Sequence, residues 1–155
     1  MDMSGKIELK APKQRVWEAL NDPEILKACI PGCESLEKTS DEGFAATAVL
    51  KVGPIKAKFQ GKVRLLDIIA PTSYTITGEG QGGIAGFASG RAKVVLEEID
   101  PETTELSYDT EAKVGGKIAQ LGARLIDSTA KKLAGQFFEQ LGAQVSSKTL
   151  AGSGN

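Results

Sequence analysis

The stretch that decides the fold is IKAKFQGKVRL, residues 55–65. Its odd-numbered positions are apolar or small, and its even-numbered positions are lysine, glutamine or arginine. Because side chains of a β-strand alternate between two faces, this pattern predicts a strand in an antiparallel sheet with one dry and one wet face. Residues 104–114 repeat the alternation, with Leu106, Tyr108, Ala112 and Val114 on one side.

The segments around these two strands give the order of the remaining elements. Residues 7–9 are typical of a short first strand, and Ala11-Pro12 opens a helix with Val16, Trp17 and Leu20 on its apolar face. Asn21-Asp22-Pro23 begins a second short helix, which Pro31-Gly32 ends. Turn signals then separate about six strands; they lie at residues 41–43, 53–54, 70–72, 78–83 and 100–102.

After Gly115-Gly116 the pattern changes to that of one long amphipathic helix. Apolar residues recur at helical spacing from Ile118 to Val145, and about 30 residues make a helix of roughly 45 Å. We expect one domain over residues 1–147 and a disordered tail over 148–155. The sequence therefore predicts an α+β fold, a curved antiparallel sheet of about six or seven strands wrapped around a long C-terminal helix.

Small residues dominate the face that the sheet is expected to turn toward this helix. They include Gly61, Gly78, Gly80, Gly90 and Ala92, and the whole chain has only eight aromatic residues. Such a face either packs closely against the helix or leaves a void, and apolar ligand pockets are a common way in which proteins use a void. We expect a cavity, with close packing of glycine faces as the alternative.

Composition excludes several kinds of site. The chain has no histidine and only two cysteines, which removes the commonest general base and any four-ligand Cys/His zinc site. We therefore expect no metal, no cofactor and no catalytic residue. No apolar run approaches the ~20 residues of a membrane span, and the first residues lack a signal peptide. These features predict a cytoplasmic protein, with peripheral contact at the inner face of the membrane left open.

One strand face is strongly basic. Residues 51–64 contain no acidic side chain and five basic ones, Lys51, Lys56, Lys58, Lys62 and Arg64. Such a face either is simply solvated or docks an anionic membrane or an acidic partner. Nucleic acid is not expected, because no exposed aromatic residues alternate with the lysines and the 19 basic residues are balanced by 20 acidic ones.

Two other motifs have ordinary structural interpretations. Residues 78–83 match G-x-G-x-x-G, but strand-like residues lie on both sides, so the sequence predicts a hairpin connection instead of a phosphate-binding loop. The spacing of Cys29 and Cys33 is C-x-x-x-C, which favours a buried cysteine at a helix end over a redox pair.

Several phrases of the sequence resemble the carbon monoxide dehydrogenase CoxG family within the START-like, helix-grip superfamily. Residues 16–23 resemble the first helix of the superfamily. Four further segments resemble the family itself, and they are Cys29–Glu34, Lys51–Ile55, Ala85–Gly90 and Gly115–Ile126. The resemblance covers residues 3 to about 145, and the order and spacing of the segments make it specific.

The resemblance implies a helix-grip fold with a cavity between sheet and helix. It also implies an accessory role beside a molybdenum hydroxylase of the carbon monoxide dehydrogenase type, which such proteins recruit to the cytoplasmic membrane. Some family members continue into a membrane-binding tail; none follows Asn155 here, so we expect any membrane contact to come from the domain surface.

Three functional hypotheses follow. The first is a binding module whose cavity holds a lipid or a quinone, with the predicted lining residues Cys29, Phe59, Phe87, Leu121, Leu125 and Thr129. The second is a docking protein with a filled core that uses the basic strand. The third is an enzyme, which would need Asp67, Glu79 or Asp127 inside a dry pocket. The first hypothesis is preferred, and we expect no enzyme activity.

Overall fold

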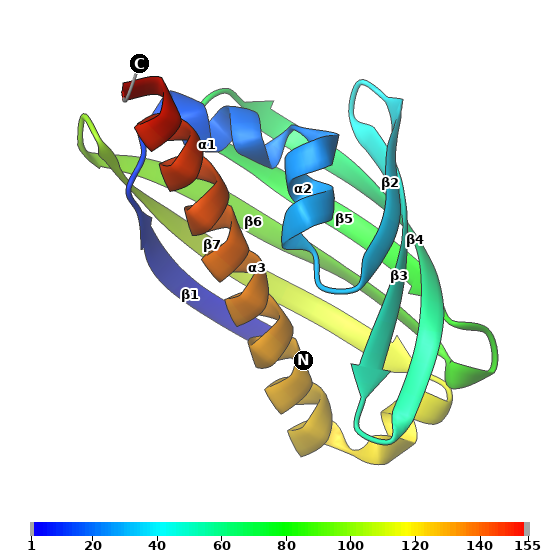
Figure 1. The fold of residues 1–155 in the computed structure, drawn as a ribbon. Helices are drawn as coiled ribbons and strands as arrows, with labels where there is room; N and C mark the ends of the chain where they lie inside the picture. Colours follow the sequence, from blue (N-terminus) through cyan, green and yellow to red (C-terminus); the bar gives the residue numbers. More distant parts are fainter. Residues whose placement is uncertain (1, 154–155) are drawn as a thin grey trace.

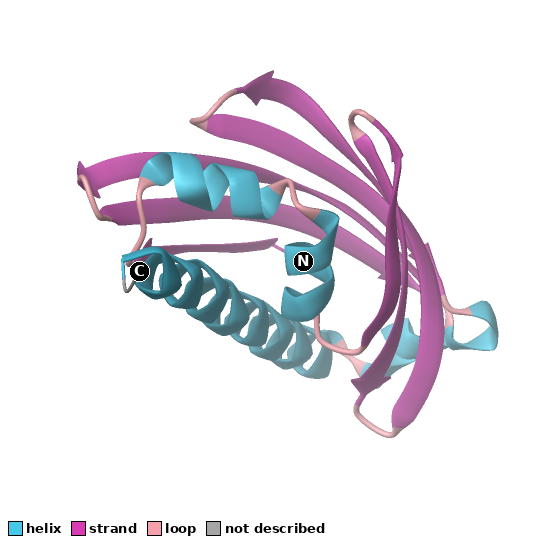
Figure 2. Cartoon of the chain, turned by 45° about the horizontal axis from the view of Figure 1, so that its top comes forward, coloured by secondary structure: helices cyan, strands magenta, loops and turns pink. Residues whose placement is uncertain are grey.

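The computed structural model describes residues 2–153 of the chain, and side chains are described for residues 2–146. Seven antiparallel strands form one sheet in the order β1-β7-β6-β5-β4-β3-β2, with three helices on its concave side (Figures 1 and 2). The strands are β1 (Asp2–Leu9), β2 (Cys33–Ser40), β3 (Gly43–Val52), β4 (Ile55–Ile69), β5 (Ser73–Gln81), β6 (Phe87–Asp100) and β7 (Thr103–Gly115). The helices are α1 (Lys13–Leu20), α2 (Pro23–Cys29) and α3 (Ala123–Ser153), with 3-10 turns η1 (Gly83–Ala85) and η2 (Lys117–Leu121). The predicted α+β fold is thus confirmed.

The alternation read from residues 55–65 sets which side of the sheet faces the helices. In β4 the odd positions up to Leu65 are buried or half-buried, and the even positions up to Arg64 are exposed. The register carries this face across the sheet, because Leu65 is opposite Ile76 of β5, and Ile76 is opposite Ala92 of β6. Directly opposed residues of neighbouring strands point to the same face. The predicted inward positions are therefore confirmed.

The two short helices are fixed by their first residues. Asp22 caps α2, since its side chain accepts a hydrogen bond of 2.9 Å from the backbone N–H of Glu24, and Pro23 is at the first helical position, where it is tolerated. Pro12 has extended backbone angles and precedes α1, which begins one residue later at Lys13.

The predicted start of the long helix was wrong. Residues 117–121 form the 3-10 turn η2, and α3 begins only at Ala123. The intervening Gly122 has a φ of +95°, a left-handed value that no α-helix accommodates and that glycine adopts readily. The predicted disordered tail, residues 148–155, lies outside the residues whose side chains are described, and it stays a prediction.

The core lies toward one end of the molecule, where α1 and α2 cover the sheet. Leu141 and Val145 of α3 are fully buried there, together with Leu9, Val16 and Leu96. By contrast, none of residues 123–135, the first half of α3, is fully buried. The hydrophobic effect therefore holds α3 to the sheet mainly through its second half.

Candidate functional site

An apolar pocket of about 320 Å³ lies between the concave face of the sheet and the helices. Strands β3 to β7 form its floor, with Met3 of β1 at one side. Its roof is formed by six side chains from the three helices and the residue after α2, which are Leu20, Leu26, Ile30, Ala134, Phe137 and Phe138. Other hollows on the surface have charged and polar walls, whereas this one is almost entirely apolar.

Space for the pocket comes from small residues at facing positions. Ala46 and Ala92 lie in its floor, and Ala134 lies in its roof. Close to them the wall is rigid, because the ring of Phe138 stacks on Tyr108 with centroids 5.0 Å apart and meets Phe137 edge-on at 5.2 Å. Small residues beside a fixed aromatic wall leave a volume that no neighbouring side chain fills.

Three hydroxyl groups supply the polar atoms of the pocket wall. They belong to Tyr74, Tyr108 and Thr110, which lie on strands β5 and β7. Burial raises the pKa of the Tyr74 hydroxyl far above its ordinary value, so this group stays neutral. A neutral hydroxyl both donates and accepts hydrogen bonds. The wall is therefore suited to an apolar molecule that carries a polar, uncharged group.

The predicted lining residues lie elsewhere, and none of the six belongs to this pocket. Leu121 and Leu125 meet at the β3–β4 turn, against Gly53, and Phe59 packs its ring against Gly82. Phe87 lies on the convex side, across Gly115. Cys29 is in the core at the end of α2, and Thr129 is half-buried on α3. The prediction assumed a cavity along the whole helix, whereas the pocket lies under α1, α2 and the middle of α3.

The aromatic walls are the part that sequence reasoning missed. Helical spacing predicts that Phe137 faces the core, but it says nothing of the adjacent pair Phe137-Phe138, although two neighbouring aromatic residues are conspicuous in a chain with eight. Tyr74 and Tyr108 each lie on a predicted strand, and their shared role requires knowing that β5 and β7 both border β6. That adjacency is a property of the sheet order, which spacing alone does not give.

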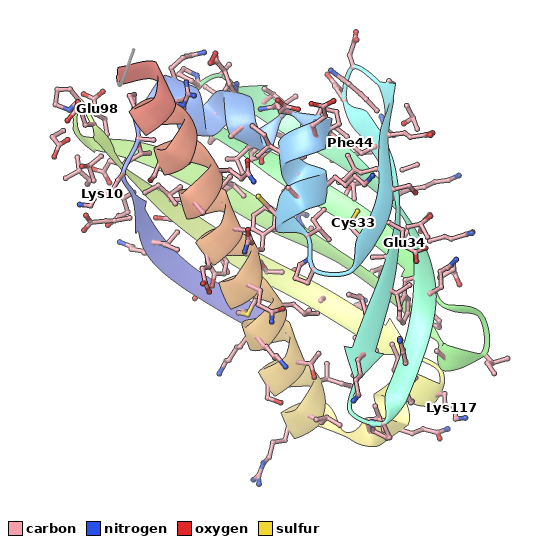
Figure 3. All side chains as sticks on the ribbon, viewed as in Figure 1. Lys10, Cys33, Glu34, Phe44, Glu98 and Lys117 are labelled. Atoms are coloured by element: carbon pink, nitrogen blue, oxygen red, sulfur yellow. The ribbon has the colours of Figure 1, made fainter. Side chains whose placement is uncertain are left out.

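The five predicted docking residues are all exposed, but they do not form one uniform patch. Lys58 makes an ion pair of 3.3 Å with Glu34, which lies at the start of β2 (Figure 3). Lys62 is opposite Glu79 of β5. Lys51 and Lys56 are opposite each other, next to the β3–β4 turn. Positive charge is therefore least compensated at that turn.

Carboxylates do not gather in the pocket. Asp67, Glu79 and Asp127 are all exposed, and residues 2–146 hold no group of three or more cysteine, aspartate or glutamate side chains arranged to bind a metal ion. The glycine cluster ends β5 and leads through η1 into strand β6, which confirms the predicted hairpin connection.

The two cysteines are free thiols in different surroundings. Cys29 is 1% exposed, and burial raises its pKa to about 11. Burial also raises the pKa of Cys33, which Lys27 partly opposes, and Cys33 is half-buried. The expected position of a buried cysteine at a helix end is confirmed for Cys29.

We expect iodoacetamide at pH 8 to alkylate Cys33 at least ten times faster than Cys29. The thiolate is the reacting form, and with a pKa of about 11 only about one Cys29 in a thousand is ionised at pH 8. Peptide mass spectrometry over a time course measures both rates, and the same experiment in 8 M urea serves as the control, in which the rates should converge. Equal rates in the folded protein would show that Cys29 is accessible.

Comparison with known proteins agrees with this architecture. The sequence model of the CoxG family, which is named for a subunit of carbon monoxide dehydrogenase, matches residues 5–146, and no curated protein sequence matches the chain. A conserved protein from Geobacillus kaustophilus is 34% identical, with a TM-score of 0.89 and coverage of 95% of this chain and 96% of that one.

More distant structures share the fold. A START superfamily protein from Mycobacterium smegmatis has a TM-score of 0.70 at 12% identity, with coverage of 94% of this chain and 97% of that one. The Zhui aromatase/cyclase of a Streptomyces species has a TM-score of 0.69 at 13% identity, covering 96% and 95%. The START-like, helix-grip fold that the sequence predicted is thereby confirmed.

Proposed function

The chain belongs to the carbon monoxide dehydrogenase CoxG family, and from this we propose that it is an accessory binding protein that holds an apolar molecule in the pocket between sheet and helices. Its partner is a molybdenum hydroxylase of the carbon monoxide dehydrogenase type, which it links to the membrane. The single observation that carries the proposal is the apolar pocket of about 320 Å³ with three hydroxyl groups in its wall.

The pocket supports a quinone or a lipid as the class of ligand. Its volume is at the lower end of the range of small-molecule sites, about 300–1,000 Å³, so it accepts a ring or one end of a chain, with the remainder outside. Tyr74 and Tyr108 offer neutral hydroxyls on neighbouring parts of the wall. A quinone carbonyl or a lipid ester accepts a hydrogen bond from such a group without bringing charge into an apolar site.

A binding role is also favoured over catalysis. Apart from the two tyrosines, the described residues that line the pocket carry no ionisable group. General acid–base chemistry needs a group whose pKa lies near the working pH, and the raised pKa of Tyr74 moves it away from neutrality. We therefore propose that the protein carries its ligand unchanged.

A docking module with a filled core is the second candidate, favoured by the exposed lysines of β4. Among residues 2–153 no helix is at once long enough and apolar enough to cross a membrane. The two candidates differ in whether the pocket takes up a molecule, and a titration with an apolar ligand therefore separates them.

Trp17 offers a direct test, because it is the only tryptophan and lies 5.3 Å from the ring of Tyr74, which lines the pocket. We expect decylubiquinone to quench its fluorescence in a saturable manner, reaching a plateau at one quinone per chain. A fatty acid that displaces the quinone would restore the signal and indicate a lipid as the better ligand. Quenching that rises linearly, as for free N-acetyltryptophanamide in parallel, would contradict the proposal and leave the docking module.

A further inference from the structure

Three segments that are far apart in the sequence meet at one end of the molecule. The β3–β4 turn lies against the start of α3, since Gly53 faces the side chains of Leu121 and Leu125. Gly82, just before η1, lies against Phe59 of β4, and Gly86, just after η1, lies against Ile118 of η2. We call this region, formed by the β3–β4 turn, η1, η2 and the first turn of α3, the basic end (Figure 1).

Charge at the basic end has one sign. Residues 43–66, 80–96 and 112–126, which supply it, contain no aspartate or glutamate. Five exposed cations surround it, and they are Lys51, Lys56, Lys113, Lys117 and Arg124. Acidic residues come only at the borders of these segments, as Glu79, Glu111 and Asp127 do.

The compensating acidic residues lie at the opposite end of the strands. The three turns there, with the strand ends beside them, hold Asp41, Glu42, Asp67, Glu97, Glu98, Asp100 and Glu102. Glu98 and Lys117 mark the two ends in Figure 3. The net charge of −1 therefore conceals a separation of charge along the long axis of the sheet. Such a separation orients a protein in an external field.

An apolar side chain projects from the middle of this cationic ring. Ile84, in η1, is 92% exposed, and it is the most exposed large apolar residue among those described. Phe87, which begins β6 beside it, is 46% exposed. A solvated isoleucine on a loop tip gains free energy by entering any apolar phase that the loop can reach.

From these observations we propose that the basic end is a docking surface for an anionic lipid membrane, with Ile84 inserted among the lipids and the five cations at the headgroups. Lysine and arginine near such a surface and an apolar tip that enters the acyl boundary are the two contributions that peripheral membrane binding combines. A lone projecting apolar tip fits a fluid lipid layer better than a protein interface, which needs a contiguous patch. The proposal rests on the proposed function in one respect, since it supplies the membrane contact assumed there.

Co-sedimentation with vesicles of phosphatidylglycerol and phosphatidylcholine tests the surface. We expect Ile84→Glu to weaken binding about tenfold or more, and Lys56→Glu combined with Lys117→Glu to weaken it about 25-fold. High salt should weaken binding of the unaltered protein, because screening acts on the exposed cations. Vesicles of phosphatidylcholine alone should retain much less protein.

Two matched controls locate the contact. Ile69 is also exposed, at the other end of β4, so Ile69→Glu should leave vesicle binding unchanged. Lys62 is on the same strand as Lys56 but opposite Glu79, so Lys62→Glu should have less than a twofold effect. Equal losses for Ile84→Glu and Ile69→Glu, or for Lys56→Glu and Lys62→Glu, would overturn the proposal. Absence of vesicle binding, with the purified hydroxylase binding at the basic end instead, would overturn it as well.

The outcome is separable from that of the proposed function. Ile84 and Lys56 do not line the pocket, so their variants should titrate with decylubiquinone like the unaltered protein. Loss of vesicle binding with normal Trp17 quenching supports the docking surface. Failure of the unaltered protein to bind vesicles, with normal quenching, overturns the docking surface and leaves the pocket proposal standing.

Discussion

Ala134→Phe is expected to reduce the affinity for an apolar ligand about 70-fold while the protein stays folded. Ala134 lies in the roof of the pocket, where the space is partly due to its small side chain. A benzyl group there displaces about 100 Å² of apolar ligand contact, worth about 2.5 kcal/mol, and each 1.4 kcal/mol is a factor of ten in affinity. Quenching of Trp17 by decylubiquinone measures the change.

The matched control is Ala143→Phe, on the same helix but exposed. It adds the same group to α3 without entering the pocket, so its affinity for the quinone should equal that of the unaltered protein. Circular dichroism and thermal unfolding show whether each variant is folded. If both variants bind the quinone equally well, the ligand lies outside the pocket and the proposed site is wrong.

The largest effect on stability is expected for Leu141→Ala, about 3–5 kcal/mol in the free energy of unfolding. Leu141 is fully buried at the point where α3 meets the core. Removing its side chain loses apolar burial and leaves a void, because the surrounding residues belong to both layers and collapse only in part. Urea unfolding followed by circular dichroism gives the free energy.

Leu133→Ala makes the same change in the first half of α3, where the leucine is only half-buried. We expect a loss of about 1 kcal/mol for this variant. The contrast tests the conclusion that α3 is held mainly by its second half. Similar losses for the two variants would mean that the whole length of the helix grips the sheet.

Much of the fold was predictable because alternation is a local signal. The pattern of residues 55–65 identified a strand and its dry face, and the burial of Leu65 with the exposure of Arg64 confirms it. The turns were predictable for the same reason, since Gly53-Pro54 restricts the backbone over two residues. The start of α3 was not, because the sequence pattern of η2 is apolar at helical spacing and only the φ of Gly122 separates the two.

The pocket was harder to predict than the sheet. Its existence was anticipated from small residues, of which Ala92 is in fact in the floor. Its position depends on where α1 and α2 cover the sheet, which is a long-range property. Leu121 and Leu125 were chosen for their spacing on a helix, but the β3–β4 turn packs against them. Residues close in a helical pattern thus share a face without sharing a site.

The basic end illustrates a similar limit. In the sequence the cations of residues 51–64 appeared as one strand face, whereas the register pairs Lys62 with Glu79 and brings Lys51 beside Lys56. Lys117 and Arg124 join them only through the contacts of η2 and α3 with the β3–β4 turn and η1. Local charge patterns therefore identified part of the surface, and the sheet order was needed for the rest.

The central claim is that the pocket between sheet and helices holds an apolar molecule in the working protein. The most direct measurement is organic extraction of the protein purified without detergent, followed by mass spectrometry for quinones and lipids, with Ala134→Phe purified in parallel. The account predicts a quinone or lipid near one molecule per chain, and a large reduction in Ala134→Phe. Equal amounts of the same molecule from both proteins, or an empty extract together with no saturable quenching of Trp17, would contradict it.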